Sequence, residues 1–256
     1  MSSNRKLQDN KILETLKAYM RHLVSETSQY PSLFKYCDFD GAVKMLSFQN
    51  LQFTRADSLN DKDEINISKC DFSRQIKILR KHHIPESMID ARINELKKFF
   101  SGIGICSCGK RPNNEILWNR YSKRNGESLE DGVCIELDQS MVINYLFSKG
   151  IKVIALLVKY FDNVNEFIPW DLFLGNQLEK SIFFQLLYSS KERIKWEEED
   201  EIRLICSELF EGIHYRPTLT PTCFKAVYYG KDMTLQQRMK IGHLLRNYPK
   251  IERHFR

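Results

Sequence analysis

Seven short runs of β-branched, aromatic and cysteine residues recur along this chain, and they constrain its fold more than any other feature of the sequence. Each run is bounded by turn-forming residues, which is typical of a strand. The predicted strands are residues 33–37, 51–55, 104–108, 132–137, 152–160, 201–207 and 224–230. Apolar residues at helical spacing lie before and between them and predict helices at 7–23, around 39–46, and at 85–100, 138–147 and 177–188.

The order of these elements favours one class of fold. Strands and helices alternate without a regular βαβ rhythm, and no glycine-rich phosphate loop follows a strand. We therefore expect an α+β fold with a mixed, mainly antiparallel and possibly split sheet of about seven strands with flanking helices. Walker-type NTPases and Rossmann dehydrogenases are set aside. Without repeats or linkers, residues 1–256 are predicted to form one domain, with an N-terminal helical extension at 1–30 and a basic C-terminal helix at 231–256.

Composition and targeting signals indicate a folded cytoplasmic protein. The chain is 42% hydrophobic and 12% aromatic, which is ordinary for a protein with a core. No apolar run approaches the roughly 18 residues of a membrane span, and no apolar signal core follows the polar N-terminus. The seven cysteines lie mostly in strand-like runs, so we expect reduced, buried thiols.

The net charge of +6 is concentrated near the C-terminus. Between residues 231 and 256, seven Lys or Arg stand against Asp232 and Glu252, with apolar residues at helical spacing. Such a helix can pack by its apolar face and leave the basic face in solvent, or it can contact nucleic acid.

Four polar clusters are candidates for a functional site. They comprise Lys35 and Tyr36; Asn60, Asp61 and Glu64; Trp118 and Tyr121; and the acidic run within KWEEEDEIRLI at 195–205. Each cluster also has a structural explanation. The second can cap a turn or helix, the tryptophan and tyrosine of the third can pack together at i and i+3, and the acids can form a solvated turn.

Strand alternation divides the acidic run. In an extended chain, successive side chains point to opposite faces. The apolar residues at 202, 204 and 206 then share the core face, while Glu199, Glu201 and Arg203 share the other. Two carboxylates and a guanidinium in one row can tune one another's ionisation, which suits a binding cleft.

With these clusters in order, the chain resembles a bacterial family catalogued as a domain of unknown function, number two-nine-seven-one, whose members include relatives of AbiG-type abortive phage-resistance proteins. The matching residues are Lys35-Tyr36, Asn60-Asp61 with Glu64, Trp118 with Tyr121, the strand at 132–138, and Trp196 with Glu199, Glu201 and Arg203. Two departures are Lys62, where the family has Pro, and extra residues at 127–130. The resemblance implies a phage-defence setting, but it implies no particular chemistry.

The late Glu-x-Glu motif at 199–201 is also similar to that of ADP-ribosyltransferases, which have a split sheet and use NAD as substrate. That similarity implies Glu201 and Glu199 as catalytic residues. It implies a nucleotide-binding role for Lys35, Tyr36, Asn60, Asp61, Glu64, Trp118, Tyr121 and Arg203. Here a Lys stands on the first strand, where those enzymes usually have Arg or His, and the chain has no Ser-Thr-Ser motif in its middle. A nucleic acid or a protein is the expected acceptor.

Two other classes of function stay open. Asp61, Glu64, Glu199 and Glu201 could hold a divalent cation in a nuclease, although their spacing is not diagnostic and no resident metal is predicted. Alternatively, the polar row belongs to a non-catalytic module that senses a ligand or binds a cognate partner protein.

Overall fold

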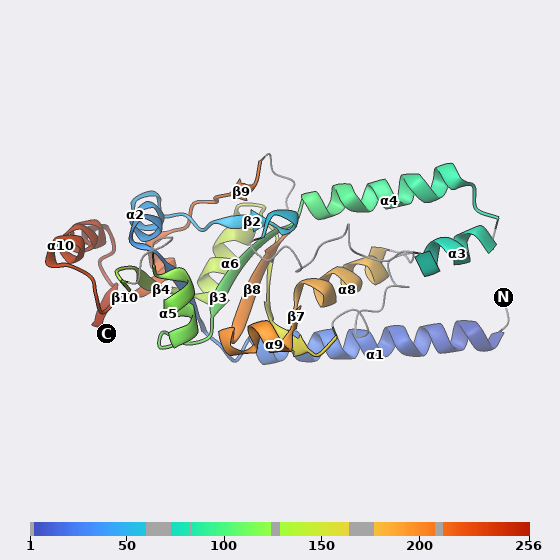
Figure 1. Cartoon of the computed structure of the whole chain (residues 1–256), viewed down its shortest axis with the longest axis horizontal. Helices are drawn as coiled ribbons and strands as arrows, with labels where there is room; N and C mark the ends of the chain where they lie inside the picture. The colour runs from blue at the N-terminus through green and yellow to red at the C-terminus, as the bar shows by residue number, and fades with distance from the viewer. Residues whose placement is uncertain (1–2, 60–72, 82, 124–128, 164–176, 208–211) are drawn as a thin grey trace.

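The computed structural model describes residues 3–59, 73–81, 83–123, 129–163, 177–207 and 212–256. A nine-stranded sheet lies at its centre, and helices pack on the sheet and extend beyond one end of it (Figure 1). Neighbouring strands of this sheet are antiparallel except for one parallel pair among the described residues, β10 with β11. The predicted α+β class with a mixed, mainly antiparallel sheet is confirmed.

The sheet follows the path β11-β10-β4-β1-β3-β2-β9, and β8 pairs with both β3 and β5. Its strands are β1 (Ser32–Cys37), β2 (Phe53–Arg55), β3 (Gly104–Gly109), β4 (Val133–Asp138), β5 (Val153–Leu157), β8 (Glu201–Cys206), β9 (His214–Tyr215), β10 (Phe224–Tyr229) and β11 (Glu252–Phe255). A separate parallel pair contains β6 (Lys159–Phe161) and β7 (Ser190–Glu192). All seven predicted strands are present, but the one at 152–160 is divided, because the chain leaves the main sheet at Val158.

The described helices are α1 (Ser3–Thr27), α2 (Phe39–Phe48), α3 (Ser73–Lys81), α4 (Glu86–Ser101), α5 (Glu115–Tyr121), α6 (Gln139–Ser148), α8 (Gln177–Tyr188), α9 (Arg193–Trp196) and α10 (Leu235–Leu244). Side-chain caps explain where several begin. Asp38 accepts a hydrogen bond from the backbone of α2, Asp138 from that of α6 and Asn114 from that of α5. Such caps satisfy backbone N–H groups that have no partner within the helix.

The C-terminal segment differs from the prediction. Residues 231–256 were expected to form one basic helix, but α10 ends at Leu244 and the chain returns to the sheet as β11. This strand runs parallel to β10. The strand's sequence, ERHF, is short and mostly polar, so it lacks the apolar pattern that identified the central strands.

The sheet is split between β1 and β3. β1 pairs with β4 along its whole length, and β3 pairs with β8 along its whole length. In contrast, β1 and β3 are in register only at Phe34 and Gly109. The same edge of β3 pairs with β2 at residues 104–105. Among the residues that the structure describes, no strand therefore pairs with 106–108 on that edge, and the sheet is open there.

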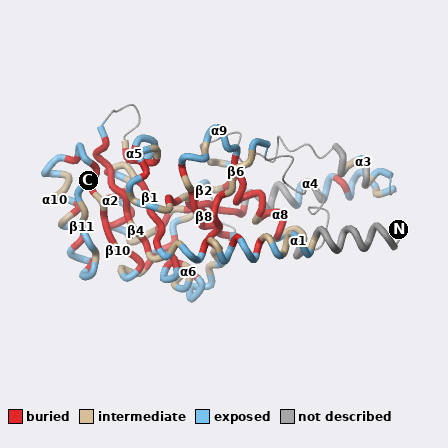
Figure 2. Tube along the Cα trace, turned by 90° about the horizontal axis from the view of Figure 1, so that it is seen from below, coloured by how far each residue is buried: buried red, intermediate tan, exposed pale blue. Residues whose placement is uncertain are grey.

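Two hydrophobic clusters lie on opposite faces of the sheet. The large one contains the inward side chains of the central strands with those of α2, α6, α8 and the end of α1, and it forms the buried centre of Figure 2. The smaller one contains Phe34, Tyr36, Leu117, Trp118 and Cys134, where α5 covers β1 and β4. β8 is buried on both faces.

The described residues also bear on the predictions about cysteines and membrane spans. The six cysteines among them form no disulfide, and five are buried. Within the same residues, no helix is both long and apolar enough to span a membrane.

Candidate functional site

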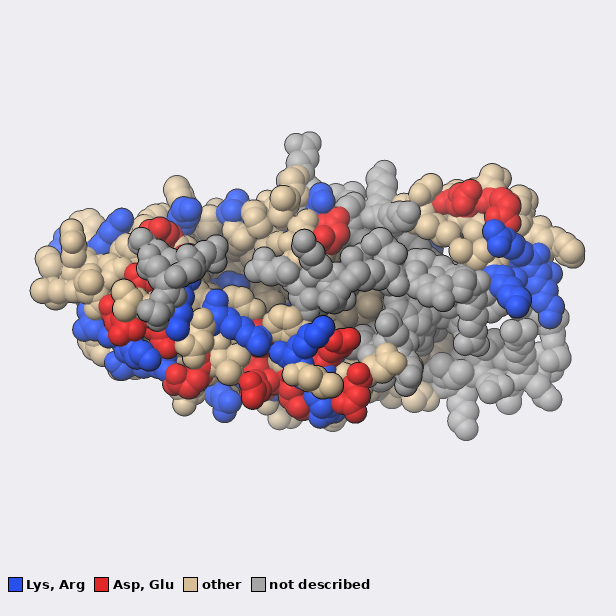
Figure 3. Space-filling model, in the orientation of Figure 1, with Lys and Arg blue, Asp and Glu red and all other residues tan. Residues whose placement is uncertain are grey.

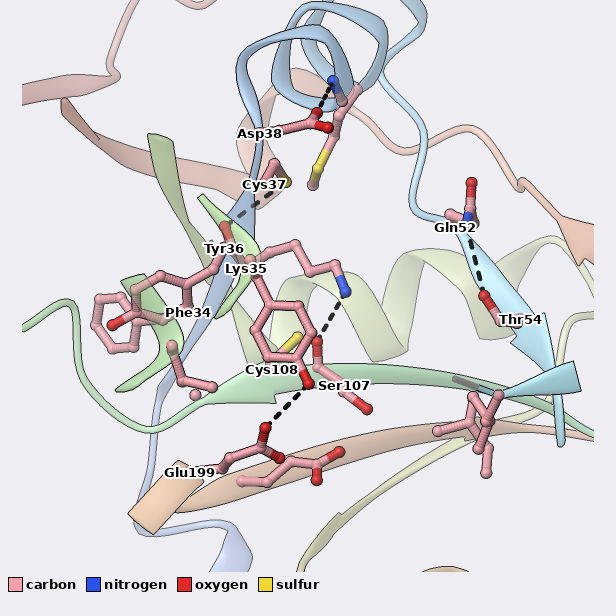
Figure 4. A pocket seen from close by; sticks show the side chains of 18 of the residues that line it. Phe34, Lys35, Tyr36, Cys37, Asp38, Gln52, Thr54, Ser107, Cys108 and Glu199 are labelled. Atoms are coloured by element: carbon pink, nitrogen blue, oxygen red, sulfur yellow. Dashed lines mark hydrogen bonds between the residues drawn. The ribbon is translucent and has the colours of Figure 1, made fainter. Parts of the chain in front are cut away.

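A cleft of about 900 Å³ lies at the opening of the sheet. Residues of α2, α5, β1, β2, β3 and β7 line it, together with residues of the segment 196–201. Figure 4 shows Lys35 of β1, Thr54 of β2 and Ser107 of β3 around it, with Glu199 close to β3. The volume is within the range of roughly 300–1,000 Å³ that small-molecule sites have. Of the predicted site residues, Lys35, Tyr36, Tyr121, Glu199 and Glu201 all line it.

Lys35 bridges the opening. Its Nζ donates a hydrogen bond of 2.9 Å to the carbonyl oxygen of Ser107, which lies on the unpaired edge of β3. The ammonium group thus satisfies a backbone acceptor that a neighbouring strand would otherwise have satisfied. Lys35 therefore fixes the width of the opening and also places a positive charge at its floor.

Tyr36 is held in place by groups from α5 and the loop before it. Its hydroxyl donates to the carbonyl of Arg111 at 2.7 Å and accepts from the backbone N–H of Asn114 at 3.1 Å. Trp118 packs edge-to-face on the Tyr36 ring, with 5.3 Å between centroids. Burial raises the pKa of the Tyr36 hydroxyl above its ordinary value, so the ring enters the cleft wall as a neutral, rigid surface.

Lys191 joins the two glutamates. Its Nζ lies 3.0 Å from Glu199 Oε2 and 2.7 Å from Glu201 Oε2. Arg203 Nε donates to Glu201 Oε1 at 2.8 Å, and another Arg203 nitrogen donates to the carbonyl of Tyr188 at 2.8 Å. The side chains of Lys191, Glu199, Glu201 and Arg203 are all 5% exposed or less. Charges buried to this extent are stable only when they are paired and hydrogen-bonded, as these are.

The environment keeps Glu201 ionised. Burial raises the pKa of its carboxyl, but attraction to Arg203 and Lys191 and the hydrogen bonds from both outweigh burial and lower the pKa from 4.5 to about 2. Glu201 is therefore a carboxylate at neutral pH.

Glu199 receives two further groups at the mouth of the cleft. Arg120 Nη1 and the Tyr121 hydroxyl both donate to its Oε1, at 2.8 and 2.9 Å. Burial, and then the charges of Glu199 and Glu201, raise the pKa of the Tyr121 hydroxyl. The ring of Tyr121 is on the rim, with 39% of the residue exposed.

Trp196 orders the cations of this network. Arg120 and Lys191 both lie over its ring, at 4.8 and 4.6 Å from the centroid. Both cations also bind Glu199. Cation–π contacts of this kind restrict where a flexible side chain can place its charge.

The predicted alternation holds for β8 but not for Glu199. Glu201 and Arg203 share one face of the strand, as expected, and contact each other. Glu199 belongs to the 3₁₀ helix η4 (Glu197–Glu199), and Asp200 then turns the chain with a φ of 50°. The two glutamates therefore meet through a turn and a shared lysine, rather than along one strand.

Two other predicted site residues lie behind the cleft wall. Trp118 is fully buried, and its Nε1 donates to the carbonyl of Pro112 at 2.8 Å. It supports Tyr36 and does not line the cleft. Arg203 is likewise behind the wall and acts on the cleft through Glu201. Both Trp118 and Tyr121 belong to α5, whose last residue is Tyr121.

Asn60, Asp61 and Glu64 lie outside the described residues. Leu59, directly before them, lines the cleft. Within the described ranges, no group of three or more His, Cys, Asp or Glu side chains is placed to hold a metal ion. Glu199 and Glu201, the two described acids of the nuclease hypothesis, are bound by basic side chains.

Sequence reasoning missed several lining residues. Lys191, Lys44, Phe48 and Arg216 stand alone in their segments without a motif. Trp196 was a clearer signal, because it directly precedes the acidic run.

Exposed charge around α9 is locally neutralised. Figure 3 shows basic and acidic side chains interspersed over this region. Arg193 pairs with Asp162 at 3.0 Å and with Glu197 at 2.8 Å, and Lys195 pairs with Glu192 at 3.3 Å. This part of the surface is mixed in charge and does not form a continuous basic face.

Comparisons with known proteins give little beyond the geometry. No family model matches the chain, and no curated protein matches it. Among solved structures, the chain is similar to Thermus sp. 2.9 DarT in complex with ADP-ribosylated ssDNA. The TM-score is 0.37 and the identity 8%, over 89% of this chain and 95% of that chain. A likeness at this TM-score defines neither the fold family nor the activity.

Proposed function

We propose that the chain is an NAD-consuming enzyme of the ADP-ribosyltransferase or NAD glycohydrolase type. One observation carries the proposal: residues from three distant parts of the sequence line one cleft at the opening of a split sheet. They are Lys35 and Tyr36 on β1, Tyr121 on α5, and Glu199 with Glu201 at the start of β8.

The chemistry follows from the charge of Glu201. Cleavage of the nicotinamide–ribose bond leaves its electron pair on the nicotinamide nitrogen and develops positive charge at the ribose C1′. A fixed carboxylate in a partly desolvated cleft stabilises that charge more than it stabilises the ground state. The acceptor then attacks C1′ and loses its proton. With water the product is ADP-ribose, and with a nucleic acid or protein acceptor it is an ADP-ribosylated macromolecule.

Other side chains have supporting roles in this proposal. Glu199 accepts a hydrogen bond from a ribose hydroxyl and so orients the sugar. That hydroxyl replaces either the Tyr121 hydroxyl or the Lys191 ammonium group as a donor to the Glu199 carboxylate. Tyr121, being partly exposed, offers a ring for the nicotinamide. Arg203 and Lys191 keep Glu201 ionised and in place.

The biological setting is proposed from the resemblance described above. A phage-defence effector that consumes NAD in the cytoplasm, controlled by a cognate partner protein, is consistent with a cleft of this kind. The acceptor class decides whether such an effector modifies nucleic acid or protein.

A second candidate is a ligand-sensing module that binds a nucleotide without cleaving it. The observation in its favour is that protein donors already occupy both oxygens of Glu199 and of Glu201. A network satisfied in this way also stabilises a fold without taking part in catalysis.

Nicotinamide release from NAD, measured by chromatography, tests the proposal. Wild-type protein is incubated with NAD alone, and with added single-stranded nucleic acid or protein acceptors. We expect release in at least one condition, and a loss of roughly 10²–10³-fold in Glu201→Gln, the size of effect seen when a transition-state charge partner is removed. Glu136→Gln is the matched control, because Glu136 is a partly buried, hydrogen-bonded glutamate that does not line the cleft.

Folding of each variant is checked by circular dichroism, and NAD binding by calorimetry. NAD binding without release in every condition would favour the sensing module. Absence of both binding and release in the wild type contradicts the proposed function.

A further inference from the structure

The cleft has a second rim that differs from the wall carrying the glutamates. It is formed by one face of α2 and by the chain just after β9. Gly41, Lys44 and Phe48 recur on α2 at intervals of three and four residues, so they share one helix face. All three line the cleft.

Arg216 completes this rim from a distant part of the sequence. The segment 217–219 runs beside residues 49–51, through hydrogen bonds from Leu51 N to Pro217 O and from Leu219 N to Gln49 O. Arg216 is exposed, and its Nε donates to Gln52 Oε1 at 3.0 Å. The guanidinium thus lies on the cleft lining beside Gln52, in the chain that connects α2 to β2.

Phe48 is the most exposed aromatic side chain of the cleft lining, with 66% of the residue accessible. A single exposed aromatic is ordinary on a protein surface. Here, however, it lies one helical turn from Lys44, at the rim of a cleft that also carries Arg216. A ring beside two cations is the combination that binds nucleotides, because a base stacks on the ring while phosphates meet the cations.

The positions of the charged side chains indicate how a dinucleotide would be oriented in the cleft. Lys191 and Arg203 are committed to the buried glutamates on the opposite wall, and Lys35 donates to the backbone of β3. Lys44 and Arg216 lie on the outer rim, where their charges can meet phosphate groups, while the carboxylates of Glu199 and Glu201 line the opposite wall. A dinucleotide therefore fits with its phosphates toward α2 and its nicotinamide toward β8.

We propose that Phe48, Lys44 and Arg216 form a binding subsite for a nucleoside diphosphate, the adenosine diphosphate half of NAD. This assignment rests on the proposed function for the identity of the whole ligand. The base stacks on Phe48, and the diphosphate lies between Lys44 and Arg216.

Calorimetry with ADP, NAD and nicotinamide mononucleotide as probes tests the subsite. We expect Phe48→Ala to weaken ADP and NAD binding by roughly tenfold, which corresponds to about 1.4 kcal/mol. Lys44→Gln and Arg216→Gln are expected to weaken both by roughly threefold each, and to reduce the dependence of affinity on salt. Nicotinamide mononucleotide binding should be unchanged in Phe48→Ala.

Two control variants and one further charge variant complete the test. Phe147→Ala removes a phenylalanine that is 71% exposed on α6 and does not line the cleft, so it should not change ADP binding. Lys250→Gln removes an exposed lysine outside the cleft and should also have no effect. Asp40→Asn, one turn before Lys44 on the cleft side of α2, should strengthen ADP binding, because it removes a negative charge.

The outcomes separate this subsite from the proposed function. NAD binding that is equally tight in wild type, Phe48→Ala and Arg216→Gln overturns the subsite and leaves the proposed function intact. Weakened ADP binding in these variants, together with an absence of NAD cleavage, supports the subsite and contradicts the enzyme. Wild-type protein that binds neither ADP nor NAD overturns both.

Discussion

Acid should remove a specific part of this protein's stability through Glu201. The pKa of this carboxyl is about 2 in the folded chain, against an ordinary value of 4.5. A difference of about 2.5 pH units corresponds to about 3 kcal/mol at 1.36 kcal/mol per unit. Because the folded-state pKa is the lower one, this stability is fully present above about pH 5 and is lost as the pH falls toward 2.

Glu201→Gln isolates the effect, because the amide does not titrate. We expect the free energy of unfolding of the wild type to fall by about 2 kcal/mol more than that of the variant between pH 5 and pH 3. Urea unfolding followed by circular dichroism at each pH measures both curves. At pH 7 the variant should be less stable by about 3–5 kcal/mol, since the substitution leaves buried cations without a full countercharge.

Glu198→Gln is the control, because Glu198 belongs to the same acidic run but is exposed. Its curve should follow that of the wild type. If the curves of wild type and Glu201→Gln fall in parallel from pH 5 to pH 3, Glu201 is not held ionised by Lys191 and Arg203, and the electrostatic basis of the proposed mechanism fails.

Five other substitutions probe the stability of the fold, two of them at residues that support the cleft, and urea unfolding measures each. Lys191→Met should destabilise the chain by about 3–5 kcal/mol at pH 7, since it leaves two neighbouring buried carboxylates without their shared cation; an unchanged midpoint would show that the bridge contributes nothing. Asn114→Ala removes the cap of α5 and the hydrogen bonds that Asn114 donates to the carbonyls of residues 198 and 199. We expect it to lower the free energy of unfolding by about 1–3 kcal/mol and to weaken NAD binding. Thr234→Ala, which removes the cap of α10, should cost about 1 kcal/mol and leave NAD binding unchanged. Gly132→Ala should prevent folding, because the added Cβ would lie 2.2 Å from a backbone oxygen, whereas Gly150→Ala meets no atom within 4 Å and, at a φ of 80°, should cost only about 1 kcal/mol.

Strands with a strong local pattern were predictable. The runs that became β1, β3, β4, β8 and β10 are dominated by β-branched, aromatic and cysteine residues, and each is mostly buried in the structure. Their composition reflects burial, and burial is why the pattern is visible. β7, β9 and β11 are two to four residues long and partly exposed, so no such pattern identifies them.

Part of the site was predictable for the same reason. Lys35 and Glu201 are charged residues within otherwise apolar strands, and a charge in that position needs either a partner or a function. Glu199 was predicted as a site residue but for the wrong geometric reason, since Asp200 breaks the alternation. Trp118 was expected to stack a ligand, yet its position under Tyr36 makes it part of the smaller core.

The sequence by itself therefore determined the α+β class, the central strands and the residues whose charge conflicts with their apolar surroundings. These properties depend on the order of apolar and charged residues within a short segment, which can be read directly from the sequence. Only the tertiary structure decided that β1 and β3 separate after one residue pair, that Lys191 joins the two glutamates, and that Arg216 bonds Gln52 at the cleft. Each of these depends on residues distant in sequence meeting in space, and an isolated Lys, Phe or Arg carries no signal of the partner it will meet.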